Sequence, residues 1–205
     1  LAFMTYAEGL PDMSASARRA GHELLLHVPM QPRSRGYDPG PNVLTNDLPP
    51  DEVMRRLNWG LGRFEGFVGI NNHMGSRFTA APEGMAYVMR ELRGRGLLFL
   101  DSLTAGNSVG RQAAENAGVP YAVRDIFLDD TPYDSAVVRR QLDKLEAVAR
   151  QRGYAVGIGH PHRETLDVLA EWLPEARRRG IALVPISAIV RHRADIVQAA
   201  AKTTD

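Results

Sequence analysis

Side chains that bear an imidazole, a carboxylate or a guanidinium group stand at the ends of several short apolar runs of this chain. They are His27, His73, Asp101, Arg124, Asp125 and His160. Neutral imidazoles combined with carboxylates suit Zn²⁺ or a similar divalent ion, and two histidines with one carboxylate leave coordination positions open. Such an ion polarises a carbonyl group, while a further carboxylate acts as base and a further histidine as acid. The pattern therefore indicates a hydrolytic metal site.

Each of these side chains also has a structural explanation when it is taken alone. A single histidine at the end of a strand is most often a surface or hydrogen-bonded residue, and Asp101 and Asp125 fit helix N-caps or loop anchors. His22 and His27 are five residues apart on a predicted strand, so their side chains point to opposite faces and should not both bind one metal ion. His27 is the better ligand candidate because it is nearer the C-terminal end of that strand. It is the joint placement at successive strand ends that favours a site.

Short apolar runs alternate with segments of helical periodicity along the chain. The predicted strands are 1–6, 23–28, 67–71, 97–101, 121–124, 155–159 and 182–186. The predicted helices are 10–20, 50–63, 82–95, 108–117, 134–152, 163–179 and 189–201. This order is typical of βα units and predicts one α/β domain with a parallel sheet or barrel, whose strands end on a common rim.

The composition excludes several other classes of protein. The 205 residues include 25 basic and 24 acidic side chains and no cysteine, which excludes disulfide scaffolds and thiolate sites. A net charge of +1 gives no electrostatic reason to expect nucleic acid or an anionic membrane as partner. The longest nearly apolar stretch, 181–190, is about half as long as a membrane-spanning helix. The chain begins at Leu1 within an apolar run, and we expect further residues upstream.

Five segments of the chain together resemble the divergent polysaccharide deacetylase family, in order and spacing, over residues 1–189. They are GHELLLHVPM at 21–30, NHMGSRFT at 72–79, GLLFLDS at 96–102, RDIFLD at 124–129 and IGHP at 158–161. The resemblance implies a distorted seven-stranded (β/α) barrel of the glycoside hydrolase/deacetylase type at 1–189, followed by a helical tail at 190–205. It also implies that the first strand of the barrel, which ends in two adjacent aspartates in related enzymes, precedes Leu1. The adjacent aspartates at 129–130 follow the wrong strand to replace that pair.

The resemblance implies a metal-dependent hydrolase that removes acetyl groups from an N- or O-acetylated carbohydrate of the periplasm or cell envelope. Related enzymes hold their metal with an aspartate and a His-x-x-x-His box, and His27 resembles the first histidine of that box. Gln31 stands where the second histidine belongs, so His73 is expected as the replacement ligand. We therefore expect His27 and His73 to bind a divalent ion, with Zn²⁺ as the first choice.

Further roles and partners follow from the same resemblance. His160 resembles the acid histidine of the family, and the expected catalytic group consists of His160, Asp125 and Arg124. The residues expected to bind substrate are Asn72, Ser76 and Asp101. The expected partner is an acetylated polysaccharide or oligosaccharide, with no nucleic acid and no membrane-spanning segment in this chain.

Two other functions stay open from the sequence. The missing box histidine and aspartate pair also fit a noncatalytic carbohydrate-binding protein of the cell envelope, built on a deacetylase barrel that has lost its activity. A glycoside hydrolase using Asp101 and Asp125 would require their carboxylates to lie roughly 5–10 Å apart.

Overall fold

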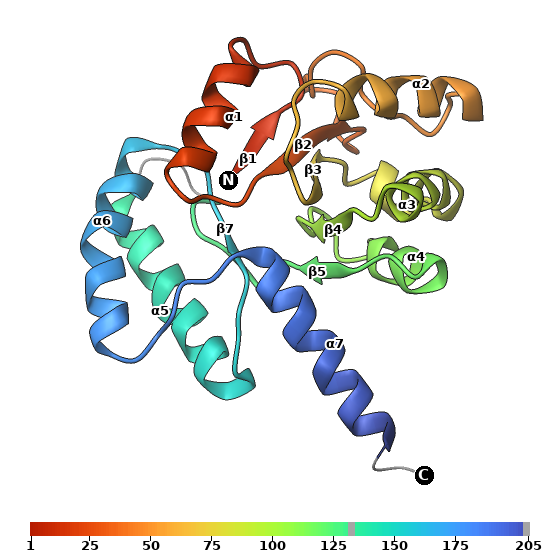
Figure 1. The fold of residues 1–205 in the computed structure, drawn as a ribbon. Coiled ribbons are helices and arrows are strands. Elements are labelled where there is room, and N and C mark those ends of the chain that lie inside the picture. The colour runs from red at the N-terminus through yellow and green to blue at the C-terminus, as the bar shows by residue number, and fades with distance from the viewer. Residues whose placement is uncertain (131–133, 203–205) are drawn as a thin grey trace. The chain divides into compact units, whose positions relative to one another are not determined.

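The chain forms two compact units of alternating strands and helices, which are described separately below. The structure is a computed structural model that describes residues 1–130 and 134–202 (Figure 1). The first unit is Leu1–Val123 and the second is Arg124–Asp205.

The first unit is built around a five-stranded parallel sheet with strand order β1-β2-β3-β4-β5. Its strands are β1 Ala2–Met4, β2 Leu25–Met30, β3 Gly69–Met74, β4 Leu98–Asp101 and β5 Tyr121–Val123. The helices between them are α1 Leu10–Arg19, α2 Pro50–Leu61, α3 Pro82–Arg95 and α4 Gly110–Ala117, with a short 3₁₀ helix at Phe78–Ala80. Proline in the first turn of α1, α2 and α3 marks where these helices start, because proline fixes φ and needs no backbone donor there.

One face of this sheet is packed against the helices. Leu26 and Val28 of β2, Ile70 of β3 and Phe99 of β4 belong to the same buried apolar cluster as the inner faces of the helices. Side chains of a strand alternate between its two faces, so the residues between these positions point to the opposite face of the sheet. His27 of β2 lies beside Asn71 of β3 in the register, and Pro29 lies beside His73. The fold thus brings His27, Asn71 and His73 to the face away from the helices.

The second unit pairs two very short parallel strands with long helices. The strands are β6 Ile126–Phe127 and β7 Gly157–Ile158, and the helices are α5 Ser135–Arg152, α6 Arg163–Arg178 and α7 Ile186–Lys202. Leu128, Val138, Leu142 and Val168 form its small apolar cluster. Asp134 caps α5 by accepting hydrogen bonds from the backbone N–H groups of the first turn.

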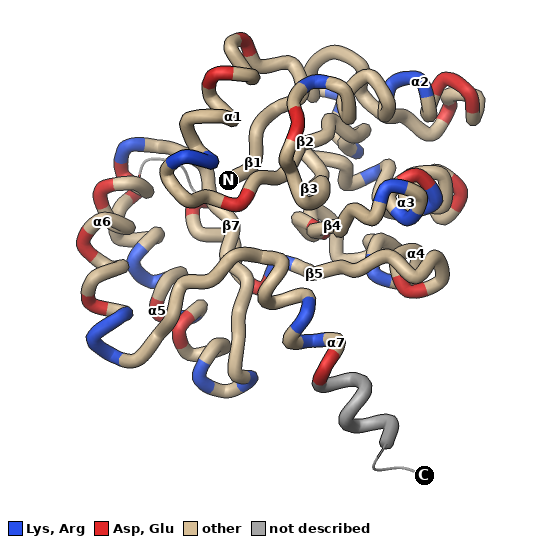
Figure 2. The backbone as a smooth tube through the Cα atoms, in the orientation of Figure 1, with Lys and Arg blue, Asp and Glu red and all other residues tan. Residues whose placement is uncertain are grey.

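Acidic and basic side chains are interspersed on the helices instead of being gathered by sign, as Figure 2 shows along α2 and α3. Several of these charges pair within one helix at the i,i+4 spacing, as Glu52 does with Arg56 and Glu91 does with Arg95. Among the described residues, no helix has both the length and the apolar character needed to cross a membrane.

The predicted α/β organisation with a parallel sheet is confirmed, and one predicted strand is wrong. Residues 182–185 have no regular structure, and α7 starts at Ile186, inside the predicted strand and three residues before the predicted helix. Pro185 cannot donate a backbone hydrogen bond to a sheet, and Leu183 and Val184 are 68% and 44% exposed. The strand β6, by contrast, was not predicted.

The described residues form a five-stranded sheet and a two-stranded sheet, so the closed seven-stranded barrel stays a prediction. The single domain at 1–189 and the tail at 190–205 also stay predictions. Residues 203–205 of that tail lie outside the part of the chain that the structure describes.

The close approach of β3 to β4 gives a first testable prediction. A Cβ atom added at Gly69 would lie 2.3 Å from the carbonyl oxygen of Leu98, so Gly69→Ala must push the two strands apart. We expect a loss of about 1–3 kcal/mol in the free energy of unfolding, measured by urea denaturation. Gly94→Ala is the control, because its added methyl group meets nothing within 4 Å and the helix gains about 0.5–1 kcal/mol. Equal stability of the two variants would contradict the packing described for β3 and β4.

Candidate functional site

The first polar cluster lies on the sheet of the first unit, where β2 and β3 approach their carboxyl ends. Nδ1 of His73 is 3.2 Å from Nε2 of His27, and the two rings meet edge to face with their centroids 4.9 Å apart. Both side chains are partly buried. The structure therefore brings together the two histidines that the sequence analysis expects to bind a metal, although their role as ligands stays a prediction.

Asn72 points to the other face of β3 and is fully buried there. Its Oδ1 accepts a hydrogen bond from the backbone N–H of Ser102 at 2.8 Å, and its Nδ2 donates to the carbonyl oxygen of Met74 at 2.7 Å. Ser102 Oγ donates back to the carbonyl oxygen of Asn72 at 2.9 Å. The Asn72 side chain thus joins β3 to the end of β4 and holds Met74, whose φ of 52° is uncommon for a residue other than glycine. Its expected contact with substrate stays a prediction.

Asp101 and Ser76 organise loops at the same end of the sheet. Asp101 is 1% exposed, and its carboxylate accepts hydrogen bonds from the backbone N–H of Leu103 at 2.8 Å and from Ser108 Oγ at 2.7 Å. This geometry matches the loop-anchor explanation of Asp101. Ser76 Oγ accepts a hydrogen bond from the backbone N–H of Arg33 at 2.9 Å. Nothing in these contacts tests the substrate-binding roles expected for Asp101 and Ser76.

The second polar cluster lies in the second unit and is centred on the buried carboxylate of Asp129, which is 4% exposed. Asp129 Oδ2 accepts hydrogen bonds from the backbone N–H of His160 at 2.6 Å and from Thr165 Oγ1 at 2.9 Å. Asp129 Oδ1 lies 3.1 Å from Nδ1 of His160. Because a buried charge must be hydrogen-bonded to be tolerated, these contacts fix both the carboxylate and the neighbouring ring.

His162 completes this cluster. Asp129, His160 and His162 can each offer one ligand atom such that the three atoms lie within 4.8 Å of one another. Among the described residues, no other group of three or more His, Cys, Asp or Glu side chains is arranged in this way. The His160 side chain is 48% exposed, and the His160 and His162 rings are 5.6 Å apart. The cluster is therefore a possible site for a divalent ion, formed by two imidazoles and one carboxylate.

Arg124 and Asp125 lie near the start of β6 and make contacts of their own. The Arg124 guanidinium stacks over the Phe127 ring at 5.4 Å from its centroid. Asp125 accepts a hydrogen bond from the backbone N–H of Val156 at 2.8 Å and pairs with Arg152 at the end of α5, whose pKa it raises. Asp125 thus ties α5 to the segment before β7, as a loop anchor does, and the catalytic roles expected for both residues stay predictions.

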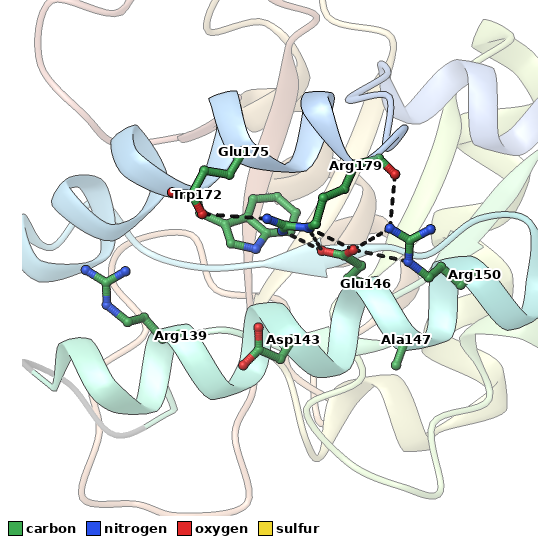
Figure 3. Close-up of a pocket in the computed structure, with 8 residues that line it drawn as sticks. All are labelled: Arg139, Asp143, Glu146, Ala147, Arg150, Trp172, Glu175 and Arg179. Atoms are coloured by element: carbon green, nitrogen blue, oxygen red, sulfur yellow. Dashed lines mark hydrogen bonds and ion pairs between the residues drawn. The ribbon is translucent and has the colours of Figure 1, made fainter.

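A groove of about 470 Å³ between α5 and α6 holds a different kind of charge cluster (Figure 3). Glu146 of α5 accepts hydrogen bonds from Arg150 at 2.7 Å and from Arg179, the residue after α6, at 2.6 Å. The hydrogen bond from Arg179, helped by the one from Arg150, lowers the pKa of Glu146 to about 2. The charges that line the groove therefore join the two helices to each other.

This lowered pKa gives a second testable prediction. A carboxyl group with a folded-state pKa of about 2 and an ordinary value of 4.5 stabilises the fold above pH 4.5, and the contribution disappears as the pH falls through 2. We expect Glu146→Gln to lower the free energy of unfolding by about 1 kcal/mol at pH 7 and by progressively less between pH 4.5 and 2. Asp143→Asn, which removes a charge from the same groove, is the control. An equal loss of unfolding free energy in Glu146→Gln at pH 7 and at pH 2.5 would contradict the stabilising role given to the ionised Glu146 carboxylate.

The amino-acid sequence matches one known protein family over most of its length. The pattern of the family described as divergent polysaccharide deacetylase matches residues 1–190. The uncharacterized protein YibQ of Escherichia coli (strain K12) is 39% identical over 160 residues, which are 78% of this chain and 50% of that protein. An uncharacterized protein of Haemophilus influenzae is 39% identical over 155 residues, which are 75% of this chain and 54% of that protein. The chain thus spans about half the length of the curated relatives it matches.

A solved structure with the same fold supports the architecture described above. The uncharacterized protein ATU2773 from Agrobacterium tumefaciens C58 superposes with a TM-score of 0.89 and 34% sequence identity. The match covers 92% of this chain and 77% of the other.

Proposed function

Because the chain belongs to the divergent polysaccharide deacetylase family, we propose that it is a metal-dependent hydrolase that removes acetyl groups from an N- or O-acetylated carbohydrate of the periplasm or cell envelope. One observation carries the proposal: a buried carboxylate lies beside two imidazoles in the second unit. Asp129, His160 and His162 are the residues that we assign to this centre. The relatives are uncharacterized, so the activity itself is our inference.

The three side chains fit a divalent ion, and we propose Zn²⁺. Asp129 supplies a negative charge that is held away from water, and His160 and His162 supply neutral nitrogen donors. Two histidines and one carboxylate leave coordination positions open, as a hydrolytic centre requires. A divalent ion bound there would polarise the acyl carbonyl of the substrate.

The orientation of His160 depends on Asp129. Without an ion, the contact between Asp129 Oδ1 and His160 Nδ1 favours the tautomer that carries its proton on Nδ1, and an ion held by both residues would take the place of that proton. In that tautomer Nε2 carries no proton, so His160 must first take up a proton there before it can transfer one to the leaving amine, the role expected for it from the family resemblance. Loss of bound metal in His160→Ala distinguishes a ligand from a proton donor.

The noncatalytic alternative is supported by one contact in the first unit. Gln31, which stands at the second histidine of the expected His-x-x-x-His box, accepts a hydrogen bond from the backbone N–H of Asn46 at 3.0 Å through its side-chain oxygen. Its side chain therefore holds a loop, as expected if the box no longer binds metal. A carbohydrate-binding protein without hydrolytic activity is the second candidate function.

The third testable prediction concerns acetate release. The purified full chain, freed of metal by chelation and reloaded with Zn²⁺, is expected to release acetate from N-acetylated chitooligosaccharides, O-acetylated xylan or acetylated peptidoglycan fragments. Asp129→Asn and His162→Ala should each reduce the rate by about 100-fold or more, because each removes a donor to the ion. His192→Ala is the control, since His192 is an exposed histidine of the same unit.

Two results would overturn this assignment. Glycan binding by the zinc-loaded chain with no acetate release from any of the three substrates would establish the carbohydrate-binding alternative. Acetate release that survives Asp129→Asn would move the active centre away from this cluster.

A further inference from the structure

Thr165 is a buried polar residue of the second unit that has no role in the centre assigned above. It lies in the first turn of α6, shortly after His162, and is 2% exposed. A threonine hydroxyl inside a helix can donate to a backbone carbonyl of the preceding turn. The Thr165 hydroxyl donates instead to Asp129 Oδ2 at 2.9 Å, across 36 residues of sequence. The start of α6 therefore carries a hydroxyl group that contacts the Asp129 carboxylate.

The two oxygens of this carboxylate have different surroundings. Oδ2 accepts hydrogen bonds from the backbone N–H of His160 at 2.6 Å and from Thr165 Oγ1 at 2.9 Å. Each oxygen of an ionised carboxylate has about two lone-pair sites, so these two donors occupy Oδ2. Oδ1 lies 3.1 Å from Nδ1 of His160, a ring nitrogen of a proposed ligand. Oδ1 is therefore the oxygen that an ion shared with His160 can bind.

The two donors to Oδ2 differ in what a substitution can change. The N–H of His160 belongs to the backbone and stays in every variant, whereas the Thr165 hydroxyl can be removed alone. Without this hydroxyl, Oδ2 keeps one donor, and the carboxylate loses one of the two contacts that stop it from turning about its Cβ–Cγ bond. Removing a group that orients a metal ligand in this way typically costs about 10–100-fold in metal affinity.

We propose that Thr165 is a positioning residue of the metal centre in the second unit, whose hydroxyl holds Asp129 Oδ2 and thereby presents Oδ1 to the ion. The inference rests on the proposed function, because it takes Asp129 as a ligand. Thr165 acts only through Asp129. The segment from His160 to Thr165 thus supplies two proposed ligands and the hydroxyl that orients the third.

Zinc titration followed by calorimetry tests this role without measuring catalysis. Every variant is made in the full chain carrying His73→Ala, so that the histidine pair of the first unit does not provide a second site. Thr165→Val replaces the hydroxyl by a methyl group of similar size, and we expect the zinc affinity to fall by about 10-fold. Thr165→Ser keeps the hydroxyl and should bind zinc nearly as tightly as the chain with Thr165.

Thr79→Val is the matched control. It also removes the hydroxyl of a fully buried threonine, which in the first unit donates to the carbonyl oxygen of Gly75 at 2.9 Å. This variant should lose stability but keep its zinc affinity, because its hydroxyl does not contact a proposed ligand. Circular dichroism identifies a variant that does not fold, and Thr165→Ala then takes the place of Thr165→Val.

The possible results separate this role of Thr165 from the proposed function. Zinc binding that is lost in Asp129→Asn but unchanged in Thr165→Val overturns the positioning role and leaves the metal centre standing. Equal losses of affinity in Thr165→Val and Thr165→Ser overturn it as well, because the hydroxyl is then not the group that matters. Absence of zinc binding, or zinc binding that Asp129→Asn does not change, overturns both the positioning role and the metal centre.

Discussion

The buried carboxylate of Asp129 is the constraint on which the second unit depends. A carboxylate that is 4% exposed must be surrounded by donors, and here they come from the backbone and ring of His160 after β7 and from Thr165 of α6. These hydrogen bonds hold the end of a two-residue strand against the start of a helix, and they fix one imidazole while leaving it half exposed. The packing of this unit and the proposed metal centre thus depend on the same carboxylate.

In the first unit, the alternation of side chains along a strand separates structural polar residues from candidate ligands. Asn72 and Asp101 are fully buried and bind loops at the ends of β3 and β4. His27, Asn71 and His73 lie on the opposite face, where two imidazole nitrogens already meet at 3.2 Å. A shift of the register by a single residue would move Asn71 and His73 to the other face, so the pairing of β2 with β3 determines which side chains lie beside His27.

The sequence predicted the parallel α/β organisation because helical periodicity and short apolar runs report burial directly. It also predicted that His27 and His73 lie close together, because both stand at the ends of predicted strands. It erred at 182–186, where apolar residues resemble a strand but Pro185 and high exposure prevent pairing. The sequence analysis set Asp129 aside and did not include His162 among the candidate ligands, because separations of 31 and 33 residues carry no local signal of contact. The sequence signal that could have indicated this cluster was the aspartate that ends RDIFLD at 124–129, together with the His-Pro-His segment at 160–162.

The most direct measurement is anomalous diffraction at the zinc absorption edge from crystals of the full chain grown with Zn²⁺. The account predicts a peak coordinated by the Asp129 carboxylate and by imidazole nitrogens of His160 and His162, at about 2.0–2.2 Å from each donor. Zinc-saturated crystals with no anomalous peak at Asp129 would contradict the central claim that this buried carboxylate is part of a metal centre.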